Sequence, residues 1–225
     1  MRTLLFAGLA LIAVMLVAAA TSSAQKPPKP PKPPGMADVT LTAGANPVTF
    51  SHPLELKGSV KGARAGVVVT LEGRAPTETV FAPLGTATTD QKGDYAFTQR
   101  PSANTVYRAT AAATPPVQSA ELLVRVMPLV GLRVSDTTPS VGQRVRFRGT
   151  VRPAHDGRLL AIQRKGADGK FVTVARTRLR DAGDTFSRYA RRVRVRRTGT
   201  YRTRVVGHND HATGYSRERT LTVGG

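Results

Sequence analysis

The second half of the chain carries arginine at every other position in three segments, a spacing that puts charge on one face of a β-strand. Successive side chains of a strand point to opposite faces, so Val145 and Phe147 are predicted to face a core while the neighbouring arginines face solvent. A guanidinium group binds phosphate or carboxylate through two parallel hydrogen bonds. The spacing therefore predicts a binding surface for an anionic polymer. Its candidate residues are Arg144, Arg146, Arg148, Arg176, Arg178, Arg180, Arg192, Arg194 and Arg196.

Most of the net charge of the chain, +20 in total, lies in the same half. Residues 128–225 contain 22 basic and 7 acidic residues, a net charge of +15, whereas residues 36–127 contain 8 basic and 7 acidic residues, a net charge of +1. Arginine makes up 20 of those 22 basic residues, as a nucleotide-composition bias could also produce. Such a bias would act equally on the first half, so the asymmetry favours a selected basic surface. Like charges opposite each other destabilise a sheet, so this surface is expected to meet a polyanion or to be shielded by salt.

The candidate ligands are the anionic polymers that an exported protein meets: wall polymer, acidic polysaccharide or lipid headgroups. Dedicated single-strand nucleic-acid binders stack bases on aromatic side chains, and the arginine-rich strands offer only Phe147, which alternation buries. Nucleic acid is therefore expected to bind only nonspecifically, through charge. Two alternatives stay open. The chain could be a structural or spacer module, or a subunit that docks an acidic protein partner, which would require an apolar centre within the basic surface.

Catalytic and metal-binding motifs are sparse in this sequence. It has no nucleophile elbow, phosphate-binding glycine loop, zinc-protease helix or paired carboxylates, so we expect no enzyme, no catalytic residue and no cofactor. Cysteine is absent, which excludes disulfides and thiol chemistry. His208, Asp210 and His211 stand close enough in sequence to suggest zinc or copper, but no second cluster completes a site. We therefore predict a polar loop there and no metal. A hydrolase or metalloenzyme would require these three residues to converge around an open coordination position.

The first 35 residues have the composition of an export and spacer segment. Residues 1–24 contain a basic start, an apolar run and a small-residue exit, the pattern of a cleaved signal peptide. The apolar run approaches the length of a membrane span, so an uncleaved anchor that contacts the membrane is the alternative. Residues 25–35, QKPPKPPKPPG, predict an extended polyproline spacer. We therefore expect a secreted or cell-envelope-associated protein.

The remaining sequence alternates short apolar runs with Gly, Pro, Asp and Asn, which is typical of an all-β sandwich. It also repeats itself. Residues 56–60 match residues 147–151 at an offset of 91, Phe81 matches Phe171 at 90, and the Tyr-Arg step at 107–108 matches the step at 201–202. A repeat of this length is a whole domain. We predict two tandem β-sandwich domains, residues 36–127 and residues 128–225, each with seven strands.

A G-x-Y-x-F step and a later Tyr-Arg pair occur in residues 93–97 and 107–108 of the first unit, and are matched to residues 183–186 and 199–202 of the second. In these motifs, both units resemble the bacterial immunoglobulin-like repeats of secreted and cell-surface proteins. Thr203 stands where an antibody domain has cysteine, and the chain has no tryptophan for the core between the sheets. The resemblance therefore implies a disulfide-free immunoglobulin-like sandwich in each unit. Motifs this short specify a fold rather than a function.

Overall fold

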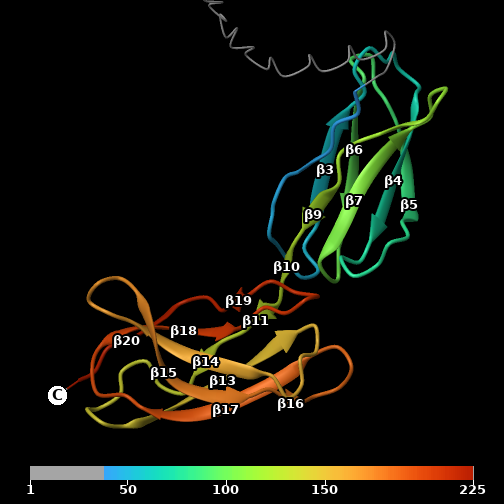
Figure 1. Cartoon of the computed structure of the whole chain (residues 1–225). Coiled ribbons are helices and arrows are strands. Elements are labelled where there is room, and N and C mark those ends of the chain that lie inside the picture. Colours follow the sequence, from blue (N-terminus) through green and yellow to red (C-terminus); the bar gives the residue numbers. More distant parts are fainter. Residues whose placement is uncertain (1–37, 225) are drawn as a thin grey trace, which may run out of the picture. The chain divides into compact units, whose positions relative to one another are not determined.

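The computed structural model describes residues 38–224, and within this range every regular element is a β-strand (Figure 1). This confirms the prediction of an all-β protein. The same range contains no helix long and apolar enough to cross a membrane. Buried hydrophobic residues form two separate clusters, one from residues 39–126 and one from residues 130–221. We call the corresponding parts the first and second sandwich. The predicted signal peptide and polyproline spacer lie outside the described residues, and the boundary between residues 127 and 128 stays a prediction.

The first sandwich contains ten strands, several of them only two residues long. They are β1 (Thr42–Ala43), β2 (Val48–Thr49), β3 (Leu54–Ser59), β4 (Val68–Arg74), β5 (Ala82–Thr88), β6 (Asp94–Gln99), β7 (Thr105–Ala111), β8 (Val117–Gln118), β9 (Leu122–Val124) and β10 (Val126–Met127). One sheet has the order β1-β3-β6, and the facing sheet has the order β5-β4-β7-β8, with β9 also paired to β7. The last strand, β10, pairs in parallel with β2. All other pairings in this sandwich are antiparallel.

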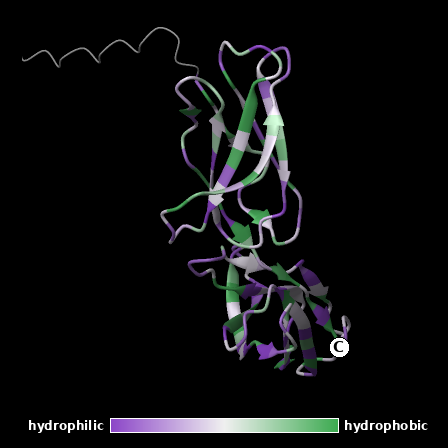
Figure 2. Cartoon of the chain, turned by 90° about the vertical axis from the view of Figure 1, so that its right-hand side faces the viewer, coloured by the Kyte–Doolittle hydropathy of each residue, from purple (hydrophilic) through white to green (hydrophobic). Residues whose placement is uncertain are grey.

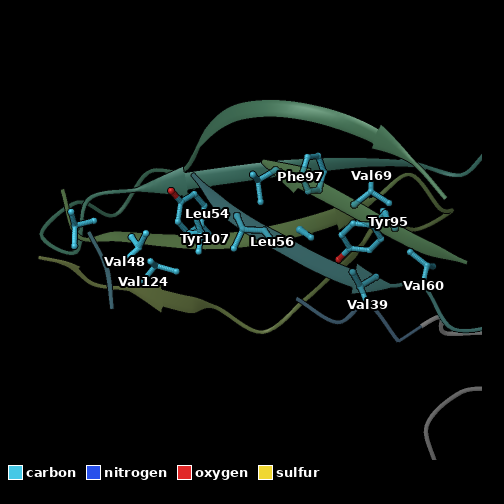
Figure 3. Packing of buried hydrophobic residues seen from close by; sticks show 14 residues of the cluster. Val39, Val48, Leu54, Leu56, Val60, Val69, Tyr95, Phe97, Tyr107 and Val124 are labelled. Carbon is cyan, nitrogen blue, oxygen red and sulfur yellow. The ribbon is translucent and has the colours of Figure 1, made fainter. Parts of the chain in front are cut away.

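The core of the first sandwich follows from the alternation of side chains along its strands. In β3, Leu54 and Leu56 are buried while Glu55 and Lys57 are exposed. Figure 3 shows both leucines among the buried side chains that fill the space between the sheets. Burying a leucine side chain contributes about 1.5–3 kcal/mol. Alternation therefore fixes which face of β3 belongs to the core.

The second sandwich also contains ten strands. They are β11 (Leu129–Val130), β12 (Arg133–Val134), β13 (Arg144–Arg152), β14 (Leu159–Lys165), β15 (Phe171–Arg178), β16 (Arg180–Asp181), β17 (Ser187–Arg194), β18 (Gly199–Val205), β19 (Gly214–Tyr215) and β20 (Arg219–Leu221). One sheet has the order β11-β13-β17-β16, with β12 also paired to β13. The facing sheet has the order β15-β14-β18-β19, with β20 also paired to β18. Bands of hydrophobic and hydrophilic residues alternate along some of the longer strands (Figure 2).

A tyrosine that packs over a glycine recurs in both sandwiches. Tyr95 lies opposite Gly58 and donates its hydroxyl to the carbonyl oxygen of Thr40. Tyr189 lies opposite Gly149 and donates to the carbonyl oxygen of Gly131 at 2.7 Å. Burial raises the pKa of both tyrosines to about 12, so the hydroxyls stay protonated donors at neutral pH. These hydrogen bonds tie the segment just before β1 to the sheet of the first sandwich, and the segment between β11 and β12 to the sheet of the second.

This pairing corrects one motif match of the resemblance. The structural equivalent of Tyr95 is Tyr189, so residues 183–186 are not the second copy of the G-x-Y-x-F step. Phe97 lies opposite Leu56 in the first sandwich, and the equivalent residue opposite Phe147 is Arg191. The tyrosine is retained in the second sandwich, whereas the phenylalanine position holds an arginine. The Gly-Asp pair recurs at residues 183–184, but the equivalent tyrosine follows only at residue 189.

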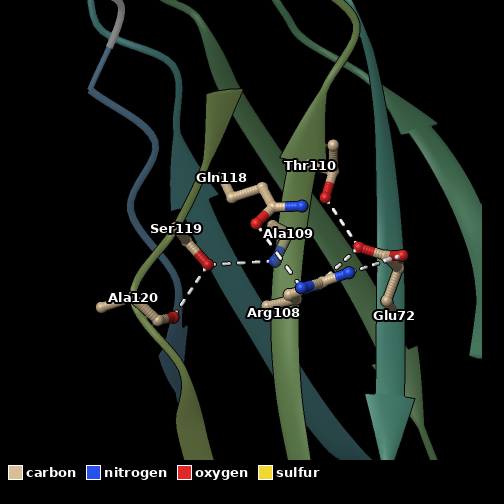
Figure 4. Close-up of polar contacts among 7 residues, drawn as sticks. All are labelled: Glu72, Arg108, Ala109, Thr110, Gln118, Ser119 and Ala120. Carbon is tan, nitrogen blue, oxygen red and sulfur yellow. Dashed lines mark hydrogen bonds and ion pairs between the residues drawn. The ribbon is translucent and has the colours of Figure 1, made fainter. Parts of the chain in front are cut away.

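The Tyr-Arg step, by contrast, is structurally repeated. Arg108 stacks over the Phe81 ring at 4.0 Å. Its Nε and Nη2 donate hydrogen bonds to the carboxylate of Glu72 (Figure 4). These hydrogen bonds from the Arg108 guanidinium are the chief reason that the pKa of Glu72 lies below its ordinary value. Thr110 adds a third hydrogen bond to the same carboxylate. In the first sandwich, the arginine is therefore neutralised by an acidic partner.

In the second sandwich the equivalent arginine also stacks on a phenylalanine ring, but no glutamate lies opposite it. Arg202 stacks over the Phe171 ring at 3.7 Å and donates Nε to the amide oxygen of Gln163 at 3.0 Å. Gln163 lies opposite Arg202 as Glu72 lies opposite Arg108. Phe81 and Phe171 are thus equivalent, as the sequence match predicted. The exchange of glutamate for glutamine leaves Arg202 with its full charge.

Candidate functional site

The outer face of the sheet built from β13 and β17 carries rows of arginine. Val145 and Phe147 are fully buried, while the arginines that alternate with them are exposed, as predicted. The same alternation in β17 buries Tyr189 and Val193. We call the exposed outward arginines of this sheet the arginine surface. Its members are Arg133, Arg144, Arg146, Arg148, Arg152, Arg180, Arg188, Arg192 and Arg194.

Antiparallel pairing sets many of these arginines directly against each other. Directly opposed residues of such a pair have their Cβ atoms about 4.5–5.5 Å apart and interact strongly. A sheet optimised for stability alone would place opposite charges or apolar side chains at such positions. Here four opposed pairs carry the same charge. They are Arg144 with Arg194, Arg146 with Arg192, Arg133 with Arg148, and Arg180 with Arg188.

Three predicted members of the site lie elsewhere. The nine candidate arginines were expected to form one surface, but Arg176 and Arg178 belong to β15, which pairs with β14 in the facing sheet. The reason is local, because β15 follows β14 after a turn at residues 166–170, and strands joined by a short turn pair as a hairpin. Arg196 lies beyond the end of β17. Arg144, Arg146, Arg148, Arg180, Arg192 and Arg194 do share the predicted face.

Arg133, Arg152 and Arg188 were missed. Arg188 and Arg152 continue the alternation of their strands, so extending the period by a few residues would have found them. Arg133 has no arginine two residues away, and only its pairing opposite Arg148 brings it to the surface. That pairing depends on the path of the chain between β12 and β13, which the alternation does not encode.

The arginines of the second sandwich have no acidic partners in the described part of the chain. No ion pair between arginine and carboxylate forms in residues 128–224, although seven acidic residues are present there. The first sandwich, in contrast, pairs Arg74 with Glu121 at 2.7 Å and Arg108 with Glu72 at 2.8 Å. Within residues 38–224, no carboxylate therefore neutralises the arginine surface by a direct ion pair.

The arginine surface borders an open hollow lined almost entirely by the second sandwich. Eight arginines contribute to its lining: Arg133, Arg146, Arg148, Arg152, Arg180, Arg188, Arg217 and Arg219. Leu129 and Tyr215, which are 41% and 42% exposed, line the same hollow. A concave surface with one sign of charge focuses its electrostatic field outward and concentrates oppositely charged ligands. The arrangement suits an extended anion better than a small metabolite, because the guanidinium groups are spread over several strands.

The histidine loop of the second sandwich has a different organisation. The two carboxylate oxygens of Asp210 lie 3.5 Å from His208 Nδ1 and 3.2 Å from His211 Nδ1. The buried ring of His155 packs edge-on against His211, with centroids 4.8 Å apart. Burial is the main cause that lowers the pKa of His155 below 6.5, and the neighbouring His211 acts in the same direction. In residues 38–224, no three His, Asp or Glu side chains are arranged to hold a metal ion.

Comparison with known proteins identifies no family. No protein-family model and no curated protein matches the chain. Among solved structures, a tetra-tandem repeat in the extending region of a large adhesion protein is 16% identical over 84% of this chain and 50% of that chain, with a TM-score of 0.37. Red sea bream transglutaminase is 11% identical over 84% of this chain and 31% of that chain, with a TM-score of 0.42. The chain thus spans half or less of either protein, and TM-scores this low carry no argument about function.

Proposed function

We propose that the protein is a non-enzymatic, exported component of the bacterial cell envelope that binds anionic polymers through its arginine surface. At this level we also assign both sandwiches to the immunoglobulin-like repeats that their sequences resemble. Wall polymer, acidic polysaccharide and lipid headgroups share the required chemistry, a dense array of phosphate or carboxylate groups. Binding is electrostatic and weakens as salt rises, because it is driven by the release of counterions from the polyanion.

The observation that carries this proposal is the set of four opposed arginine pairs without acidic partners. Each pair costs stability in the free protein. A polyanion laid across the sheet offsets that cost, since each of its charged groups lies between guanidinium groups of neighbouring strands. Arginine forks bind such groups with two hydrogen bonds each. The first sandwich pairs Arg74 and Arg108 with glutamates and has a net charge of +1 over residues 36–127, so it acts as a spacer or neutral partner.

One observation favours a second candidate, the docking of an acidic protein. Leu129 and Tyr215 lie exposed in the hollow, and protein interfaces have an apolar centre. A stable interface buries about 800 Å² on each partner, and two half-exposed side chains supply only a small part of such a centre. A purely structural module is the third alternative, and it predicts no salt-dependent binding at all.

The test is a salt titration of the chain without residues 1–24 against a labelled oligothymidylate, used as a linear polyanion of known counterion release. If the eight arginines lining the hollow each neutralise one phosphate, the plot of log K against log salt has a slope of about −5 to −6, at about −0.7 per phosphate. Arg146→Gln with Arg188→Gln should reduce the slope to about −4 by the same coefficient.

A control variant removes the same charge from the facing sheet. Lys170 lies just before β15 and Arg176 lies on it, and both are exposed. Lys170→Gln with Arg176→Gln should leave the slope unchanged. Equal effects of the two variants would mean that net charge, and not the arginine surface, binds the polymer. Absence of binding at physiological salt would refute the proposal and point to the structural module.

A further inference from the structure

A strip of apolar side chains crosses the border between the two sheets of the second sandwich. Val130 forms a parallel bridge with Ser216, so β11 connects the sheet of β13 to the sheet of β18 and β19. The residues that precede this bridge, Leu129 and Tyr215, therefore lie side by side. Val130 and Ser216 are buried, whereas Leu129 and Tyr215 point outward and are 41% and 42% exposed. The two exposed side chains form a small platform on the outer surface.

An arginine stands on each side of this platform. Arg152 of β13 lies opposite Leu129, and Arg204 of β18 lies opposite Tyr215. Both arginines have outward parity in their strands. The row across the four strands therefore reads Arg204, Tyr215, Leu129, Arg152. Neighbouring strands lie about 4.8 Å apart, so the platform is about 5 Å across and the two arginine positions are about 14 Å apart by the same spacing.

Three further features suit this row to a ligand. The Nε of Arg204 is buried and has no hydrogen-bond partner among residues 38–224. Arg202 stacks on the Tyr215 ring at 4.2 Å, which fixes the ring and adds a third guanidinium beside it. Arg217, two residues after Tyr215, lines the hollow next to the platform. Charge alone would require none of these features.

We propose that this row, Arg204-Tyr215-Leu129-Arg152, is a sugar-binding subsite, and that the polymer bound by the arginine surface is an acidic polysaccharide. This inference rests on the proposed function and narrows its ligand class. A sugar ring has an apolar face of C–H groups with the width of the platform and polar groups around its edge. The ring packs on Leu129 and Tyr215, while acid groups of the same or the next sugar reach the flanking arginines. A polyphosphate has no apolar face to place there, and a bilayer surface is too flat to follow a concave hollow.

Two polymers distinguish binding at this subsite from binding through charge alone. Oligogalacturonate is a linear polysaccharide with one carboxylate on each sugar ring, and inorganic polyphosphate is a linear polyanion without rings. In the chain without residues 1–24, Leu129→Ser with Tyr215→Ser should weaken oligogalacturonate binding about tenfold, which corresponds to about 1.4 kcal/mol. The same variant should bind polyphosphate as the parent does. Val172→Ser, which removes a 49% exposed valine from β15, is the matched control and should change neither affinity.

The outcomes distinguish the two proposals. If polyphosphate binds with the expected salt slope but the Leu129 and Tyr215 variant keeps its affinity for oligogalacturonate, the subsite is refuted and the arginine surface stands. Equal loss of both polymers also refutes it, because the platform then has no preference for rings. Loss of oligothymidylate affinity alone would assign the platform to nucleic-acid bases. If no polyanion binds the parent chain even at low salt, the arginine surface itself is wrong.

Discussion

Substituting arginines of the arginine surface should stabilise the folded protein and, at the same time, weaken its binding to the polymer. The variant is Arg146→Gln with Arg188→Gln, which breaks two of the four opposed pairs, because Arg146 lies opposite Arg192 and Arg188 lies opposite Arg180. All four side chains are exposed and none bonds a carboxylate in the described structure. The substitutions therefore remove repulsion without removing a favourable contact.

The size of the effect follows from the pairing geometry. Two unit charges about 6 Å apart in water repel each other by about 0.7 kcal/mol, and opposed side-chain pairs in sheets contribute about 0.2–1 kcal/mol each. Breaking two pairs should therefore raise the free energy of unfolding by about 1 kcal/mol at low salt. For a domain of about 100 residues, this raises Tm by about 4–8 °C.

The assay is thermal unfolding of the chain without residues 1–24, in about 10 mM and about 1 M salt. The screening length falls from about 30 Å to about 3 Å between these conditions, so the gain of the variant should disappear at high salt. The control variant, Lys170→Gln with Arg176→Gln, opposes no arginine, since Arg176 lies across from Ala161. It should change Tm much less.

Two results would refute this reasoning. A variant that is less stable than the parent at low salt would mean that the arginines make favourable contacts that offset their repulsion. A gain that persists unchanged in about 1 M salt would show that the effect is not electrostatic, because screening is then nearly complete. Either result would remove the main argument that the surface is kept for a ligand.

Two further predictions concern stability. The pKa of His155 is lowered by burial in the folded state, so between its folded value and the unfolded value near 6.5 the unfolded chain binds more protons. Stability should therefore fall as pH drops below about 6.5. In His155→Phe, Tm should no longer fall between pH 7 and pH 5; a fall that persists would show that another group titrates. A Cβ on Gly149 would lie 2.9 Å from Tyr189 Cε1 and clash with the Gly131 carbonyl. Gly149→Ala should therefore lower the free energy of unfolding, measured in urea, by about 1–3 kcal/mol. Gly224→Ala is the control and should have no effect, because a Cβ there meets no atom within 4 Å. Equal effects of the two substitutions would contradict the packing argument.

The alternation of apolar and charged residues along the chain predicts well which face of a strand is buried. The segment 144–148 was expected to bury Val145 and Phe147, and both are fully buried. These predictions succeed because a side-chain period of two is a local property of the backbone. The match between the two Tyr-Arg steps is correct for a similar reason. The Phe171 ring on which Arg202 stacks is placed by the local hairpin of β14 and β15.

Sheet membership and register lie beyond the reach of alternation. Arg176 and Arg178 have the right period, but the hairpin with β14 takes them to the facing sheet. Arg133 joins the arginine surface only through its position opposite Arg148. The platform of Leu129 and Tyr215 depends on a bridge between segments more than 80 residues apart. Such contacts are set by the packing of the whole sandwich, so no local pattern contains them.

The arginines of β17, and Arg191 above all, also affect whether copies of the chain associate with one another. Within the described residues, only the short β16 pairs with β17 on its outer side, so no strand is hydrogen-bonded there to the backbone from Tyr189 to Arg194. Arg191 has the inward parity of Tyr189 and Val193 and is nevertheless exposed. Charged side chains on both faces of an edge strand prevent another strand from pairing with it. The same charges that are proposed to hold a polymer therefore keep copies of the chain from adding to one another, and neutral variants of this strand must be checked for aggregation.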